Sequence, residues 1–416
     1  MRKTPVVPKR ALLLVVGILL IATNLRAPFT SVAPLLEMIR ASFGLTAAQA
    51  GLVQTLPLLA FAVFSPFAAG MANRLGMEKS LFLALLVIVT GIFLRSWAGL
   101  TGLYGGTLLI GLGIATGNVL LPGILKRDLP HKAASLTGLY ALTMGLAAAL
   151  GSAVMIPVAH DFGAGWHNAL LSTVVFPLIA LIMWFPQLTR KSVNETGRSG
   201  SRQRKSTGVW GAGLAWQVSL YFGLNSFIYY IIVAWLPAML QNLGYSVTEA
   251  GSLHGVLQLS TAVPGFFIGP LLAKLRDQRA PGVLFALLGT LGLAGLLLFP
   301  SLATVCVVLI GISTGAGVIL GLAFISLRSG NAVQAAALSG MAQSVGYILA
   351  AGGPPVVGLI HDRTGDWTFP LVSCTSLSLI LAVLGYLAGR ARQLPEHNGP
   401  DTEFSSPGIC HQENEI

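Results

Sequence analysis

The sequence contains few charged residues for its length. Asp, Glu, Lys and Arg make up 9% of the 416 residues, whereas soluble domains carry roughly 25%. Acidic residues are the scarcer kind, with 14 Asp and Glu against 25 Lys and Arg. This scarcity excludes an ordinary soluble domain. Hydrophobic residues account for 54% of the chain and mean hydropathy is +0.77, so most of the surface is expected to face lipid.

Cysteine and catalytic motifs are also sparse. The three cysteines, Cys306, Cys374 and Cys410, lie far apart without a CxxC spacing, which argues against a disulfide framework and against a metal site. The seven histidines form no HExxH motif, and the apolar stretches carry no paired carboxylates. We therefore expect no cofactor, no metal ion and no enzymatic activity. An integral-membrane enzyme, or a channel or receptor-like sensor, is the remote alternative class.

Twelve strongly apolar stretches are each long enough to cross a bilayer as a helix of about 20 residues. We place them near residues 11–36, 48–71, 80–97, 103–125, 134–158, 167–185, 211–240, 250–273, 281–298, 303–326, 335–358 and 367–389. The first stretch follows several basic residues and could be mistaken for a secretory signal. It continues apolar to Leu36 without a small-residue cleavage site, so we interpret it as an uncleaved first helix.

The second six stretches repeat the first six about 200 residues later. Leu109–Gly117 reappears as Leu309–Gly317, and Gln49–Gly51 reappears as Glu249–Gly251. Because the order and direction are preserved, the halves are expected to be parallel repeats with a substrate site at their seam. The prediction is an all-α membrane protein of twelve transmembrane helices in two six-helix bundles. Its parts are residues 1–186 (first bundle), 187–208 (basic linker), 209–392 (second bundle) and 393–416 (disordered tail).

A second repeated pair invites a catalytic interpretation. His160-Asp161 reappears as His361-Asp362, each five or six residues before a tryptophan. Both pairs fall in short connections, between the fifth and sixth and between the eleventh and twelfth stretches. Asp favours turns and Trp anchors helices at a membrane interface, so we expect a turn role for these residues.

Basic residues predict the orientation of the chain. They gather in the N-terminus, in the even-numbered connections and in the linker, and few lie elsewhere. Such a bias places both termini in the cytoplasm. The formal net charge of +11 is therefore interpreted as a topology signal and not as a nucleic-acid patch. We expect a monomer, embedded in the lipid bilayer of the inner membrane, that binds a small-molecule solute and, if transport is coupled, protons.

The connection between the second and third stretches carries a recognisable motif. Gly70-Met-Ala-Asn73-Arg74-Leu-Gly76-Met-Glu-Lys79 resembles the G-x-x-x-D-R-x-G-x-x-K/R signature of the major facilitator superfamily. The resemblance implies that Asn73, Arg74, Gly76 and Lys79 take part in conformational gating, because in that family the loop stabilises one conformational state. Asn73 stands where the family usually has Asp, and it keeps the hydrogen-bonding shape without the charge.

Three further segments narrow the resemblance: Thr23–Leu36, Gly117–Pro130 and Ala336–Tyr347. They resemble the cyanate-porter branch of the superfamily, the CynX/NimT group, and are more similar to its nitroimidazole-transporter members than to its cyanate transporters. The resemblance extends from about residue 11 to 392. It implies a secondary transporter that moves a 2-nitroimidazole-like or cyanate-like solute across the inner membrane by alternating access. The alternative is a proton-coupled exporter of toxic compounds, which the missing Pro-Gly-Gly run in the fifth stretch weakens.

Ionisable residues inside apolar stretches are functional candidates by default, and two clear candidates are Arg26 and His254. Thr23, Arg26 and Thr30 are spaced to form one stripe of a helix. Glu37 lies about 16 Å further along the axis at about 1.5 Å per residue, so Arg26 has no evident carboxylate partner. We expect Arg26 to be the main anchor of the solute. The alternative is that Arg26 snorkels to the interface or binds backbone carbonyls.

Polar residues at helical spacing complete the predicted site. Helix-like stripes are His254-Gln258-Thr261, Tyr221-Asn225-Tyr229 and Ser339-Gln343-Tyr347, and Asn118 stands on a fourth helix. The predicted substrate-binding residues are Arg26, Thr23, Thr30, Asn118, Asn225, Tyr229, His254, Gln258, Gln343 and Tyr347. Each polar side chain could instead be satisfied by a neighbouring helix. If transport is proton-linked, His254 is the expected carrier, unless a weak-acid solute carries the proton itself.

Overall fold

The computed structural model describes residues 9–129, 133–189, 209–330 and 332–395. These residues form an all-helical protein with 12 helices that are long and apolar enough to cross a membrane, which confirms the number expected from the sequence. Most of the predicted linker (187–208) and most of the predicted tail (393–416) lie outside the described residues.

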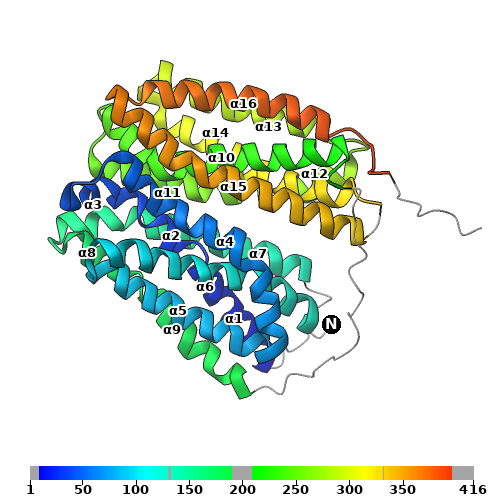
Figure 1. The fold of residues 1–416 in the computed structure, drawn as a ribbon, viewed down its shortest axis with the longest axis horizontal. Coiled ribbons are helices and arrows are strands. Elements are labelled where there is room, and N and C mark those ends of the chain that lie inside the picture. The colour runs from blue at the N-terminus through cyan, green and yellow to red at the C-terminus, as the bar shows by residue number, and fades with distance from the viewer. Residues whose placement is uncertain (1–8, 130–132, 190–208, 331, 396–416) are drawn as a thin grey trace, which may run out of the picture.

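The first half contains spans one to six. Its elements are α1 (Lys9–Asn24), α2 (Ala27–Thr30), η1 (Ala33–Leu35), α3 (Leu36–Phe43), α4 (Ala47–Leu75), α5 (Met77–Trp97), α6 (Gly99–Asp128), α7 (Ala133–Ala153), η3 (Pro157–Asp161), α8 (Gly165–Ser172), α9 (Val175–Trp184) and η4 (Phe185–Thr189). Figure 1 shows α1 to α9 grouped together in the lower part of the molecule.

The second half contains spans seven to twelve. Its elements are α10 (Gly213–Asn242), α11 (Val247–Ala262), η5 (Val263–Phe266), α12 (Ile268–Lys274), α13 (Arg279–Leu298), η6 (Pro300–Leu302), α14 (Ala303–Leu327), α15 (Ala332–Thr364) and α16 (Thr368–Ala388). We call the end with the turns from α3 to α4 and from α15 to α16 the distal end. The opposite end, with the start of α1 and the turn from α4 to α5, is the terminal end (Figure 1).

The first span is interrupted near its middle, whereas the sequence suggested one continuous helix. α1 ends at Asn24, and a new helical turn, α2, begins after Arg26, whose backbone φ of −128° and ψ of −47° departs from helix geometry. Proline at position 28 removes a backbone donor, and the following turn is held by the Arg26 carbonyl, which accepts the amides of Phe29 and Thr30 at 3.0 Å. The predicted Thr23-Arg26-Thr30 stripe is therefore wrong, because these residues do not share one regular helix.

Matching caps start the second span of each half. Thr46 and Gln49 form a capping box at the start of α4, and Ser246 and Glu249 form one at the start of α11. In each box the hydroxyl accepts an orphan backbone amide and the third helical residue bonds back to the cap. The two caps are 200 positions apart, so the sequence repeat is also a repeat of local structure.

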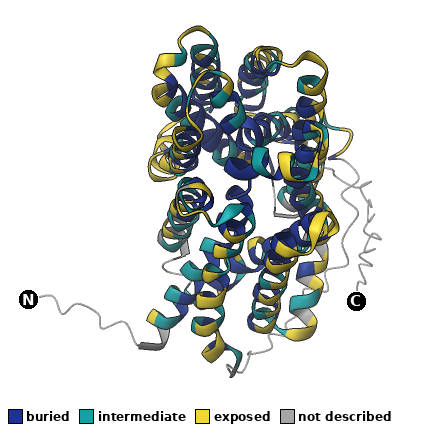
Figure 2. Ribbon diagram, turned by 90° about the vertical axis from the view of Figure 1, so that its left-hand side faces the viewer, coloured by how far each residue is buried: buried dark blue, intermediate teal, exposed yellow. Residues whose placement is uncertain are grey.

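Apolar side chains lie both inside the bundles and around them. Figure 2 shows the buried residues in the interior and exposed ones on the outer helices. Several large apolar residues are highly exposed, for example Phe67 (67%), Ile182 (72%) and Leu298 (71%), as expected of a surface that faces lipid. α10 is the most enclosed span, with 78% of its apolar window buried, because it lies among α11, α14, α15 and α16.

Two helix pairs join the halves, and glycines allow both pairs to approach closely. α4 packs against α15, where a Cβ atom on Gly51 would lie 2.7 Å from the Pro354 carbonyl oxygen. α7 packs against α11, where a Cβ atom on Gly255 would lie 3.0 Å from the Ala149 carbonyl oxygen. The two contacts are related by the repeat, since α4 corresponds to α11 and α15 to α7.

Candidate solute-binding site

Arg26 lies at the interruption of the first span and reaches across to the second half. Its Nη1 atom donates a hydrogen bond to the hydroxyl of Tyr229 on α10, and its guanidinium carbon is 5.4 Å from the centre of the Tyr229 ring. The residue keeps some accessible surface although it stands near the middle of its span. Because the helix is broken here, the guanidinium can project between the halves.

The contact continues into α11 as a chain of polar groups. The Tyr229 hydroxyl donates to Oε1 of Gln258 at 3.1 Å, and Nε2 of Gln258 lies 3.4 Å from Nε2 of His254. Gln258 and His254 are fully buried, at 0% exposure. Four residues that the sequence placed on three separate helices therefore form one connected chain, which joins the first half to the second.

Tyrosines surround the guanidinium of Arg26. The hydroxyls of Tyr140, Tyr229, Tyr230 and Tyr347 are close enough to interact with it electrostatically. The rings of Tyr229 and Tyr230 meet edge to face with centres 5.0 Å apart. Tyr140 and Tyr230 were missed in the sequence, because single tyrosines on apolar helices carry no spacing signal.

Tyr347 on α15 completes the aromatic wall. Its ring contacts Phe61 of the first half at 6.1 Å and Phe222 of the second half at 6.0 Å between centres. One turn away, Nε2 of Gln343 donates to Oγ of Ser339 at 2.8 Å. Gln343 and Tyr347 both keep some accessible surface.

Two of the predicted site residues, Thr30 and Asn225, make hydrogen bonds to the backbones of neighbouring helices. Thr30 is 0% exposed, and its hydroxyl donates to the carbonyls of Arg26 and of Ala148 on α7. Asn225 is 1% exposed and donates to the carbonyl of Thr314 on α14. Both side chains satisfy backbone acceptors within tightly packed helices, as polar groups in membrane proteins commonly do.

Two other predicted residues lie outside the polar chain. The Thr23 hydroxyl donates to the carbonyl of Leu20 within α1 at 2.7 Å. Asn118 is exposed on α6, and no hydrogen bond among the described residues connects it to Arg26.

Arg26 has no carboxylate partner among the described residues. The described ion pairs stand towards the ends of the spans: Arg40–Glu37, Arg40–Asp362, Arg127–Glu78, Arg127–Asp128 and Arg279–Asp277. A buried cation without an ionic partner costs free energy unless another group neutralises it. The site is therefore suited to an anionic or electron-rich ligand.

Arg95 on α5 supports the interruption of the first span, and sequence reasoning did not single it out. It is 1% exposed, and its Nη1 atom donates to the carbonyl oxygen of Pro28 at 2.6 Å. That carbonyl is left without its helical partner because α2 ends at Thr30. Arg95 thus holds the segment that carries Arg26. The available signal was that Arg95 is one of the few basic residues away from the terminal end.

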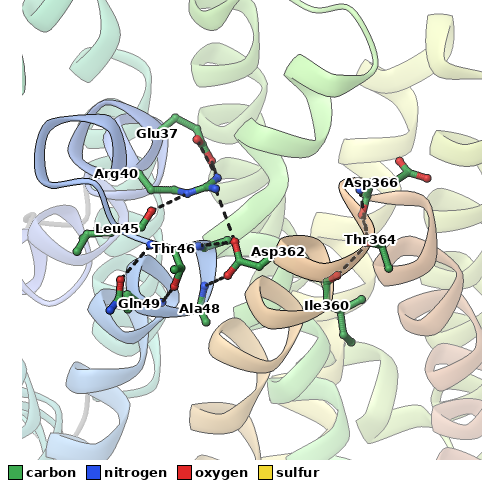
Figure 3. A network of polar contacts seen from close by, with 11 residues as sticks. Glu37, Arg40, Leu45, Thr46, Ala48, Gln49, Ile360, Asp362, Thr364 and Asp366 are labelled. Carbon is green, nitrogen blue, oxygen red and sulfur yellow. Dashed lines mark hydrogen bonds and ion pairs between the residues drawn. The ribbon is translucent and has the colours of Figure 1, made fainter.

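The distal end is closed by a contact between the halves. Oδ1 and Oδ2 of Asp362 accept the backbone amides of Ala47 and Ala48, at 2.8 and 2.9 Å, in the first turn of α4 (Figure 3). Arg40 approaches the same carboxylate at 3.7 Å. The expectation of a turn role for Asp362 is wrong, because it stands in the last turn of α15 and caps a helix of the other half.

Glycine makes this contact possible. A Cβ atom on Gly358, one turn before Asp362, would lie 2.5 Å from the Ala47 carbonyl oxygen. His361 does not join the contact, since its ring stacks on Trp367 with centres 4.1 Å apart. The side chain of Asp161, the repeat counterpart of Asp362, lies outside the described part of the structure.

The predicted gating loop stands at the terminal end. Gly76 has a φ of +87°, a conformation that favours glycine, and it separates α4 from α5. Arg74 and Lys79 are exposed, and the side chain of Asn73 lies outside the described residues. The neighbouring Glu78 forms an ion pair, with its Oε1 atom 2.5 Å from Nη2 of Arg127. Hydrogen bonds from Arg127 to Asp128 and Glu78 raise the pKa of Arg127 above its ordinary value, so its charge is permanent.

The second half repeats this terminal contact with a neutral partner. Arg328 donates to the Oε1 atom of Gln278 and to the carbonyls of Ala388 and Gly389. Gln278 stands 200 positions after Glu78. The repeat offset was the sequence signal that could have found both pairs.

A separate pocket of about 300 Å³ lies between α4, α5 and α6. Its lining is apolar apart from Thr116, whose hydroxyl already donates to the Leu112 carbonyl at 3.0 Å. It offers no free polar group to orient a polar solute, so the Arg26 region is the better candidate.

Comparison with known proteins agrees with the fold. The model of the Major Facilitator Superfamily matches residues 14–351. The chain is 53% identical over 386 residues to the 2-nitroimidazole transporter of Escherichia coli strain K12, covering 93% of this chain and 98% of the relative. It is 26% identical over 369 residues to the cyanate transport protein CynX of the same organism, covering 87% and 94%.

Among solved structures, the chain is similar to the inward-open conformation of the xylose transporter XylE from E. coli. The TM-score is 0.72 at 13% identity, over 93% of this chain and 97% of that one. At this identity the similarity concerns the fold. The resemblance seen in the sequence is confirmed, and the chain belongs to the major facilitator superfamily, in the branch of the 2-nitroimidazole transporter and the cyanate transport protein.

Proposed function

We propose that this transporter moves a small, flat, electron-rich or anionic solute, of the 2-nitroimidazole or cyanate kind, and that the solute binds at Arg26. The observation that carries the proposal is the guanidinium itself, which lies between the halves, lacks a carboxylate partner in the described chain and is surrounded by tyrosines. A planar donor fork suits a nitro group, a cyanate or a heteroaromatic anion. Tyrosine faces suit a flat ring.

In this state the Tyr229 hydroxyl takes the position on Arg26 that the solute would take. It occupies one donor of Arg26 and links the two halves at mid-depth. A solute that binds Arg26 competes with this hydroxyl and changes the contact between the halves. Solute binding and the movement of the halves are thereby coupled, which alternating access requires.

We further propose that the terminal end faces the cytoplasm of an inner-membrane monomer. The basic residues of the N-terminus and of the even-numbered connections support this orientation. With the distal end closed by Asp362 and by the α4–α15 contact, solute would reach Arg26 from the terminal side in this state. We propose no catalytic step.

The test is transport by the purified protein in liposomes. Vesicles preloaded with unlabelled 2-nitroimidazole or cyanate are diluted into the labelled compound, and entry is followed over time. We expect saturable exchange that exceeds that of protein-free liposomes, with the solute recovered unchanged. Exchange equal to that of empty liposomes for both compounds would contradict the proposed solute class, and chemical conversion of the solute would contradict the absence of catalysis.

A further inference from the structure

The hydrogen bonds between Arg26 and His254 have a direction. A guanidinium donates and never accepts, so the oxygen of Tyr229 is the acceptor of its bond with Arg26. The Tyr229 proton is therefore donated onward to Oε1 of Gln258. The amide nitrogen of Gln258 then faces Nε2 of His254. That ring nitrogen must accept, so His254 is neutral in this arrangement, with its proton on Nδ1.

Protonation of His254 is incompatible with this arrangement. A charged imidazole donates from both ring nitrogens, so Nε2 would face the NH2 group of Gln258 and two donors would oppose each other. The conflict ends if the amide of Gln258 turns over. Its oxygen then accepts from His254, and its NH2 group donates to the oxygen of Tyr229.

The turned amide changes what Tyr229 can do at the solute site. Its oxygen now accepts from Arg26 and from Gln258, which fills both lone pairs. Its own proton can no longer go to Gln258 and must point to another acceptor. The group at hand is a solute on Arg26, to which Tyr229 would add a second donor beside the guanidinium.

We propose that Tyr229, Gln258 and His254 form a relay that links the binding of one proton at His254 to the binding of the solute at Arg26. The inference rests on the proposed function, since it needs a solute at that arginine. Linkage is reciprocal: the proton strengthens solute binding, and the solute strengthens proton binding. The relay thus makes the transporter a proton symporter for an electron-rich or anionic solute.

The surroundings of His254 single it out as the group that titrates. α11 packs against α7, α10, α14, η1 and η5. The titratable side chains on these elements are Tyr140, Tyr221, Tyr229, Tyr230 and Cys306, and α11 itself also carries Glu249, whose carboxylate is bound to Ser246 at the start of the helix. Neutral phenols and thiols gain no further proton as the pH falls, whereas a neutral imidazole does. The charged residue beside the cluster is Arg26, whose charge is permanent.

Replacing Gln258 interrupts the hydrogen-bonded relay between Tyr229 and His254 and leaves both of these residues in place. Gln258→Leu keeps the size of the side chain but cannot pass a hydrogen bond between Tyr229 and His254. The matched control is Gln54→Leu, because Gln54 is buried to the same degree (1% exposed) at the repeat position of His254, and its Nε2 atom has no hydrogen-bond partner.

The experiment compares two modes of transport in the same proteoliposomes, with labelled 2-nitroimidazole as the probe. Exchange at equal pH on both sides requires only solute binding and movement of the halves. Accumulation driven by a pH gradient also requires proton coupling. For Gln258→Leu we expect gradient-driven accumulation, expressed relative to the variant's own exchange rate at equal pH, to fall to the value seen without a gradient, while Gln54→Leu retains the wild-type ratio. Gradient-driven accumulation at the wild-type level in Gln258→Leu would overturn the relay.

Binding provides a second measurement that does not depend on turnover. In detergent, wild-type affinity for the probe should increase as the pH falls through the titration of His254, by about 5- to 150-fold, the usual range of coupling between two sites. His254→Gln should bind with the weaker, high-pH affinity at every pH. A pH dependence that persists in His254→Gln would overturn the relay. Absence of both binding and exchange in the wild-type protein would instead overturn the proposed function.

Discussion

Arg26 is bound to a hydroxyl where a buried arginine would ordinarily have a carboxylate partner. The Tyr229 hydroxyl neutralises no charge, so the guanidinium keeps an electrostatic preference for an anionic or electron-rich group. Arg95, one of the other buried arginines, is held by a backbone carbonyl instead. The two residues therefore differ in role, since Arg95 positions the interruption and Arg26 is the proposed ligand of the solute.

Replacement of Arg26 should weaken solute binding strongly while leaving the protein folded. A hydrogen bond to a charged group contributes about 1.5–3 kcal/mol, so we expect Arg26→Ala to weaken binding of the probe solute by about 10- to 150-fold. Arg26→Lys should restore little of it, because an ammonium lacks the planar fork. Binding is measured by equilibrium titration and normalised to folded protein, as judged by gel filtration.

Arg363→Ala serves as the matched control, because Arg363 is an exposed arginine at the distal end. It should leave affinity unchanged within about twofold. Wild-type affinity in Arg26→Ala would show that this arginine is structural and that the solute binds elsewhere.

At the scale of helices, the contact between the start of α4 and the end of α15 is the best-defined link between the two halves. Asp362 places a negative charge on the positive end of the α4 dipole and satisfies two of its orphan amides, although it belongs to the other half. Gly358 allows the close approach that this requires. The contact stabilises the closed distal end and must break when that end opens.

Loss of this contact should favour opening of the distal end. A helix cap contributes about 0.5–2 kcal/mol, so we expect Asp362→Ala to lower the ratio of closed to open molecules by about 2- to 30-fold. Spin labels on cysteines at positions 42 and 369, which are exposed on the two halves, report the distance between them by pulsed EPR. The native cysteines are replaced beforehand.

Asp366→Asn is the control for this prediction. Asp366 lies at the same end. It is also charged, because hydrogen bonds from the side chain and backbone of Thr368 lower its pKa. Unlike Asp362, it bonds only within its own turn among the described residues (Figure 3). The distance distribution of this variant should match that of wild type. An unchanged distribution in Asp362→Ala would mean that the remaining α4–α15 contacts keep the distal end closed without the cap.

At the scale of the whole molecule, the two halves use the same positions with different chemistry. Glu78 and Arg127 form an ion pair at the terminal end of the first half, whereas in the second half Arg328 donates to the uncharged amide of Gln278. The caps of α4 and α11 follow the same 200-residue offset. Only the first half carries the interrupted span with Arg26, and the buried imidazole of the second half, His254, is matched by Gln54 in the first.

The proposed orientation can be tested in intact cells. In a variant without native cysteines, Ser42→Cys places a thiol at the distal end and Arg276→Cys places one at the terminal end, and both positions are exposed. A membrane-impermeant maleimide should label position 42 in intact cells and position 276 only after permeabilisation. The reverse pattern would invert the orientation and, with it, the side from which solute reaches Arg26 in this state.

The sequence by itself determined the class of the protein and the number of its spans. Sparse charge, twelve apolar stretches and the 200-residue repeat require a membrane bundle, since hydrophobicity and periodicity depend only on the order of residues. The rarity of ionisable groups in apolar stretches also identified Arg26 and His254 before their surroundings were known. The sequence identified the residues of the polar chain, but it did not show that they are hydrogen-bonded to one another.

Only the tertiary structure decided which polar groups meet. Thr30 and Asn225 have the sequence spacing expected of site residues, yet their side chains donate to backbone carbonyls of neighbouring helices. Asp362 has the composition of a turn residue, yet it caps a helix more than 300 positions away in the chain. The interruption of the first span and the approach of the halves determine these contacts. Both depend on how helices pack against one another, which residue spacing along a single helix cannot specify.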